Sequence, residues 1–79
     1  MYEQRIEEKR RELEDAHATQ RTARKAVLDA ESGMGLPDAE LAPLRADLAR
    51  ADENIFWVTA ELDALNELQA EHQLTLRVA

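Results

Sequence analysis

The stretch Gly33-Met34-Gly35-Leu36-Pro37 is the one cluster of helix-breaking residues in this 79-residue chain. Glycine and proline often end a helix or begin the next one. On each side of the cluster, mostly apolar residues recur at spacings that alternate between three and four, which is the heptad pattern of packed helices. The first stripe is Tyr2, Ile6, Lys9, Leu13, Ala16, Gln20, Ala23, Val27 and Ala30, and the second stripe is Leu41, Leu44, Leu48, Ala51, Ile55, Val58, Leu62, Leu65 and Gln69.

Turning the chain at the glycine cluster brings the two stripes into antiparallel register. Ala30 then faces Leu41, Ile6 faces Leu65, and the residue numbers of every pair between them add up to 71. A constant sum is the condition for pairing two antiparallel helices. We therefore predict an all-α fold, an antiparallel two-helix hairpin that packs like a coiled coil.

The hairpin takes up residues 1–79 as a single domain. Its predicted parts are helix one at about 2–32, the turn at 33–37, helix two at about 38–73 and a tail at 74–79. Pro37 and Pro43 both suit the first turn of a helix, so the sequence leaves the start of helix two open between them.

The tail differs in pattern from the two helices. The register offers it no partner on helix one beyond Gln69. Leu74, Leu76 and Val78 alternate with polar residues over five positions, which is the period of a strand. The tail is therefore expected either to fray or to dock on a partner as a short extended segment.

The predicted core is thin. Several seam residues of helix one are alanine, and two are polar, Lys9 and Gln20; we expect Lys9 to reach Glu61 or Glu12. A single core in a chain of this size rarely supplies more than about 3–5 kcal/mol, and no cysteine is present to add a disulfide. We therefore expect the hairpin to form a homodimer, as a four-helix bundle.

The net charge of −7 is concentrated in the second half of the chain. Residues 1–32 carry seven basic and eight acidic side chains, whereas residues 38–79 carry three and nine. This balance argues against direct binding of nucleic acid, which needs clustered cations. Neither a membrane span nor a signal peptide is evident, so we expect a cytoplasmic protein.

Helix two carries a second apolar face. Phe56 and Trp57 occupy heptad positions b and c, which point away from helix one, and aromatic side chains are common anchors of interfaces. The predicted interaction residues are Phe56, Trp57, Ala49, Ala60, Ala64 and Leu68. The sequence leaves open whether this face serves self-association or a different partner.

No catalytic, cofactor or metal motif is evident; the two histidines, His17 and His72, are too far apart to form a ligand set. We therefore predict a small non-enzymatic protein–protein interaction module, an adaptor or regulator that binds itself and a larger protein. The alternatives are a small acidic inhibitor of a host protein, of the type that phages encode, including a nucleic-acid mimic, and a structural assembly subunit.

Overall fold

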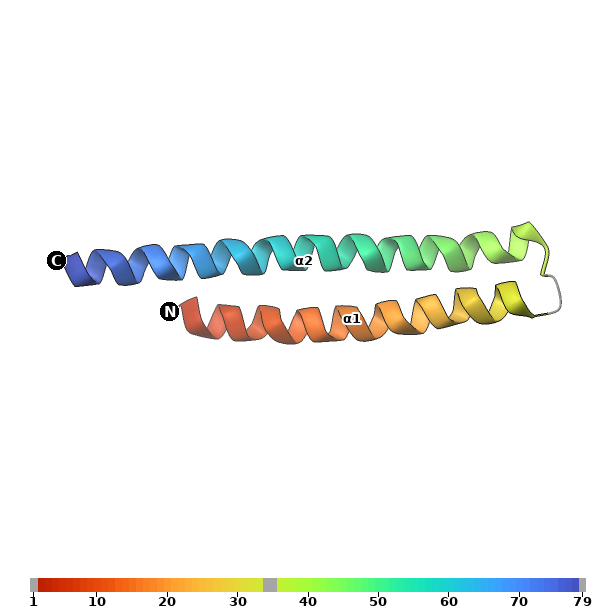
Figure 1. Ribbon diagram of the computed structural model, residues 1–79, viewed down its shortest axis with the longest axis horizontal. Helices are drawn as coiled ribbons and strands as arrows, with labels where there is room; N and C mark the ends of the chain where they lie inside the picture. Colours follow the sequence, from red (N-terminus) through yellow and green to blue (C-terminus); the bar gives the residue numbers. More distant parts are fainter. Residues whose placement is uncertain (1, 34–35, 79) are drawn as a thin grey trace.

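The computed structural model describes residues 2–33 and 36–78, which form two antiparallel helices (Figure 1). Helix α1 spans Tyr2–Ser32 and helix α2 spans Asp38–Val78. The hairpin is 66 Å long and 15 × 14 Å across. The all-α prediction is confirmed, since the described residues contain no strand. The predicted turn falls partly outside the described residues, at Met34 and Gly35, and so does the side chain of Val78.

The core is the single seam between α1 and α2, and it follows the heptad stripes. All nine residues of each stripe are buried or half-buried, whereas among the other described residues Ala26 and Thr59 alone are not exposed. Val58 is the most buried apolar residue, with 2% of its surface exposed. The burial therefore supports the antiparallel register that the two stripes predict.

The connection between the helices settles where α2 begins. The carbonyl oxygen of Pro37 accepts hydrogen bonds from the backbone N–H groups of Glu40 and Leu41, at 2.9 and 3.1 Å. Pro37 is thus the cap, and Pro43 lies inside the helix. Asp38 and Glu40 lie in the first turn, where the helix dipole favours acidic side chains.

The two polar seam residues of α1, Lys9 and Gln20, are paired across the seam. The Lys9 ammonium lies 2.5 Å from the Glu61 carboxylate and 3.0 Å from that of Glu12, which confirms the expected contacts. The hydrogen bond to Glu61 and, after it, that to Glu12 raise the pKa of Lys9 above its ordinary value. Gln20 donates a hydrogen bond of 2.5 Å to Asp52, so both polar seam residues of α1 are tied to α2.

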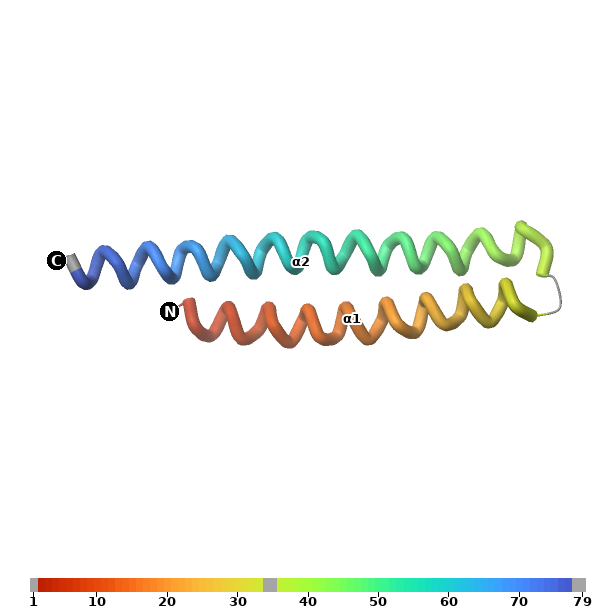
Figure 2. The backbone as a smooth tube through the Cα atoms, viewed as in Figure 1, coloured from red at the N-terminus to blue at the C-terminus, as the bar shows by residue number. Residues whose placement is uncertain are grey.

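The expectation of a separate tail from residue 74 is wrong. Helix α2 continues through Val78 and extends past the first residues of α1 (Figure 2). Extending an existing helix adds a backbone hydrogen bond for each residue fixed, whereas a five-residue alternation has no sheet edge to join. The partner-free stretch also begins later than predicted, because the rings of Tyr2 and His72 pack edge to face with centroids 6.1 Å apart.

Candidate interaction surface

The two largest apolar side chains outside the seam lie together on α2. Phe56 is 65% exposed and Trp57 is 57% exposed. Their rings pack edge to face, with centroids 5.4 Å apart and planes at 82°, which is a favourable aromatic geometry. Each ring thus covers part of its neighbour and presents the rest to solvent.

Helix geometry explains why α1 leaves this pair uncovered. Successive residues are rotated by 100° about the helix axis, so Phe56 and Trp57 point away from a seam built by Ile55 and Val58. The other predicted residues are exposed as well, including Leu68 at 44%. We call this surface the outer face of α2; it consists of Phe56, Trp57, Ala49, Ala60, Ala64 and Leu68.

Within the outer face, five residues share one side and the sixth lies at its edge. Ala49 and Phe56 fall at heptad position b, Trp57 and Ala64 at c, and Ala60 at f, so all five point away from α1. Leu68 falls at position g, next to the seam. The structure therefore brings together a flat surface of alanines around one aromatic pair.

The tail leucines that were predicted to dock are separate from this surface. Leu74 and Leu76 are 60% and 64% exposed, but helical spacing directs them to different sides of α2. Leu76 borders a small pocket of about 240 Å³ beside Tyr2 and His72. The tail thus offers two isolated apolar side chains instead of the continuous strand face that the alternation suggested.

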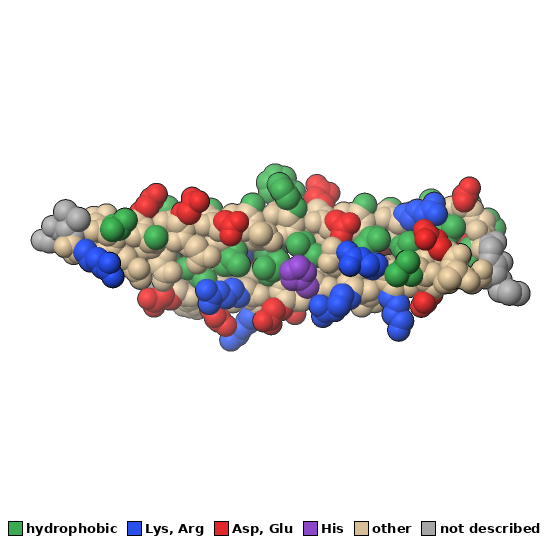
Figure 3. Space-filling view, in the orientation of Figure 1, with side chains coloured by type: hydrophobic (Ala, Val, Ile, Leu, Met, Phe, Trp, Pro, Cys, Tyr) green, Lys and Arg blue, Asp and Glu red, His purple; other side chains and the backbone are tan. Residues whose placement is uncertain are grey.

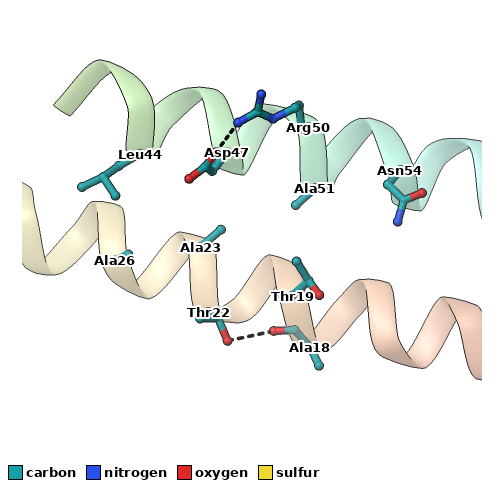
Figure 4. Close-up of a pocket in the computed structure, with 10 residues that line it drawn as sticks. All are labelled: Ala18, Thr19, Thr22, Ala23, Ala26, Leu44, Asp47, Arg50, Ala51 and Asn54. Carbon is teal, nitrogen blue, oxygen red and sulfur yellow. Dashed lines mark hydrogen bonds and ion pairs between the residues drawn. The ribbon is translucent and has the colours of Figure 1, made fainter. Parts of the chain in front are cut away.

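The structure also shows a groove that the heptad analysis missed (Figure 4). It has a volume of about 690 Å³ and lies on one flank of the seam. Its lining residues are Ala18, Thr19, Thr22, Ala23 and Ala26 of α1 and Leu44, Asp47, Arg50, Ala51 and Asn54 of α2. The signal in the sequence was the run of Ala and Thr on this flank of α1, whose short side chains leave the space unfilled.

Acidic and basic side chains are distributed along the whole length of the hairpin on the side that Figure 3 shows. Arg50 pairs with Asp47 at the groove, and Arg45 pairs with Glu31 across the seam at 3.2 Å. Among the described residues, no group of three or more potential ligands could hold a metal ion. Neither described helix combines the length and apolar character needed to cross a membrane.

This arrangement suits contact with another protein. The outer face presents exposed apolar side chains along a long helix, with the aromatic pair between Ala49 and Ala64. Charged residues lie among these side chains, namely Arg50, Glu53, Asp63 and Glu67. Comparison of the chain with models of protein families, with curated proteins and with solved structures finds no match.

Proposed function

We propose that this chain is a small, non-enzymatic protein-interaction module that acts as an adaptor or regulator through the outer face of α2. The observation that carries the proposal is the exposure of Phe56 and Trp57, at 65% and 57% of their surfaces. Contiguous exposed apolar surface usually marks an interaction site. Aromatic side chains in the middle of such a surface supply much of the binding energy.

The division of apolar residues within the chain supports the same proposal. The core is built from aliphatic residues and alanine, such as Val58 and Ala51, and none of its side chains among the described residues is less than 2% exposed. The chain's single phenylalanine and single tryptophan are both outside that core. Residues that would strengthen the core are thus placed where another protein can bury them.

The test is affinity capture with the tagged chain, from an extract to which untagged chain has been added. The double variant Phe56→Ala/Trp57→Ala removes the aromatic pair without touching the seam. The matched control is Leu74→Ala/Leu76→Ala, which removes two exposed apolar side chains from the same helix. Circular dichroism of all three proteins serves as the check that they are equally helical.

We expect the wild type and the control to capture the same protein chains, and the aromatic double variant to capture none of them. Binding through an apolar face also persists at high salt, whereas a carboxylate surface that imitates nucleic acid releases its partner as salt rises. Equal capture by the aromatic double variant and the wild type would overturn the proposal.

A further inference from the structure

We infer that the chain that covers the outer face of α2 is a second copy of the same protein, packed antiparallel about a two-fold axis between Phe56 and Trp57. This inference rests on the proposed function and specifies its partner. A two-fold dimer uses the same surface on both subunits, so that surface must be complementary to itself. The residues of α2 meet this condition in one register.

The periodicity of the helix limits the possible registers to three. Antiparallel pairing of the outer face matches heptad position b with c of the other copy, and f with f. Near the aromatic pair, this matching is achieved when facing residue numbers add up to 106, 113 or 120. Neighbouring registers differ by one heptad, which shifts the two copies relative to each other by about 10 Å.

In the register with sum 113, large side chains of one copy face large side chains of the other, and two of the outer-face alanines face each other. Phe56 of each copy faces Trp57 of the other, which gives a cluster of four rings on the axis. Ala49 faces Ala64 on both sides of the cluster, and short side chains there let the two helices approach closely. The edge-to-face contact already present within each chain then continues across the axis.

Charge complementarity selects the same register. With sum 113, Arg50, whose guanidinium already pairs with Asp47 of its own chain, lies opposite Asp63 of the second copy, which adds a second carboxylate to that pair, and by symmetry this happens twice. The acidic residues Glu53 and Glu67 each face an alanine, Ala60 and Ala46 respectively. At positions b, c and f no two like charges face each other directly, although α2 as a whole is acidic. Asp52 and Glu61 also add up to 113, but they lie at the flanking positions e and g, where they bond to Gln20 and Lys9 of α1.

The other two registers bring like charges together. Sum 106 places Glu53 against Glu53 of the second copy, on the axis itself. Sum 120 places Glu53 against Glu67 and Trp57 against Asp63. Like charges held opposite each other disfavour an interface and weaken wrong pairings. Both alternatives are therefore less favourable than the register centred between Phe56 and Trp57.

The resulting dimer has four helices in a row, with the two copies of α2 in the middle and α1 outside. It differs from a closed four-helix bundle, in which each helix has two neighbours. Because α2 associates through the side opposite α1, the groove lined by Thr22 and Ala26 stays open in both copies. The dimer thus presents that groove twice, at symmetry-related positions.

Single cysteines distinguish the three registers, because the chain has none of its own. The variants are Glu53→Cys, Ala60→Cys and the double variant with both. We expect oxidation to produce a covalent dimer from the double variant and from neither single variant. The reason is that residues 53 and 60 face each other only in the register with sum 113. Two cysteines seven residues apart on one helix are about 10 Å apart, too far for an internal disulfide.

Other oxidation patterns would overturn the register. A covalent dimer from Glu53→Cys alone indicates sum 106, and one from Ala60→Cys alone indicates sum 120. No covalent dimer from any variant, together with a solution mass of 9.0 kDa for the wild type at all concentrations, contradicts self-association altogether. In that last case, loss of a captured protein with Phe56→Ala/Trp57→Ala would still support the proposed function.

A charge exchange tests the ion pairs without cysteine. Arg50→Asp and Asp63→Arg each place like charges opposite one another, so each is expected to weaken the dimer about tenfold in dissociation constant. The combined exchange restores the opposite charges and the dimer. Arg45→Asp is the matched control, because Arg45 pairs with Glu31 on the seam side and does not face the second copy. Failure of the combined exchange to restore dimerisation contradicts the pairing of Arg50 with Asp63.

Discussion

The seam and the outer face of α2 use apolar residues in opposite ways. The seam holds modest side chains, such as Val58 and Ala51, that are almost completely buried by α1. The outer face holds the two largest apolar side chains, Phe56 and Trp57, and leaves more than half of each exposed. The difference indicates that the seam specifies the hairpin, whereas the outer face contributes its burial energy only when another chain covers it.

The largest expected effect comes from the seam. Leu65→Ala removes a side chain that is 8% exposed, and a truncation of this kind costs about 2–5 kcal/mol. A core of this size supplies only about 3–5 kcal/mol, so most of the helical signal should be lost at room temperature. Far-ultraviolet circular dichroism measures this loss; a variant as helical and as heat-stable as the wild type would contradict the assignment of the core.

Gln20→Leu tests the polar part of the seam and should stabilise the hairpin, whereas Leu65→Ala destabilises it. Gln20 bonds to Asp52 at the edge of a seam that is otherwise short of apolar area. An apolar side chain at this position should raise the free energy of unfolding by about 1 kcal/mol, because polar core residues fix register at a cost in stability. The urea midpoint measures the change, and a lower midpoint would show that the bond to Asp52 outweighs burial.

A smaller effect is expected from the titration of Lys9. Its pKa is raised in the folded protein by Glu61 and then Glu12, so its contribution to stability is complete below the unfolded pKa and is lost as the pH rises through the folded one. The wild type should therefore lose stability relative to Lys9→Gln as the pH rises above about 10.4, the ordinary pKa of a lysine side chain. Parallel pH profiles of the urea midpoint for both proteins would contradict a contribution from this ion pair.

The smallest effect on the isolated hairpin is expected from the outer face. Trp57→Ala, measured at concentrations where wild type has the mass of one chain, should change the free energy of unfolding by no more than about 0.5 kcal/mol. Its side chain is 57% exposed and packs against Phe56. A loss as large as that of Leu65→Ala would mean that Trp57 belongs to the core of the hairpin.

The hairpin could be predicted from the sequence because one rule fixes it. Pairs such as Ala30 with Leu41 follow from a periodicity and a single turn, and both are visible in the residues themselves. The exposure of Phe56 and Trp57 followed from the same heptad assignment, since Ile55 faces α1 and the two residues after it point away from α1. The contacts of Lys9 followed as well, from the reach of its side chain.

Other features could not be read in this way. The start of α2 depended on which proline caps it, and the hydrogen bonds to the Pro37 carbonyl decide this. The alternation of Leu74 and Leu76 suggested a strand, but a helix that has already formed is extended at little cost. The groove beside Thr22 was missed because a heptad pattern describes what fills the seam and not what leaves its flank empty.

The fluorescence of Trp57, the chain's single tryptophan, tests most directly whether a second copy covers the outer face. Its emission maximum would be recorded for the wild type over a dilution series in which the solution mass is followed by light scattering. We expect emission typical of water at low concentration and a shift to shorter wavelength as the mass rises to twice 9.0 kDa. Emission typical of water at every concentration would contradict it.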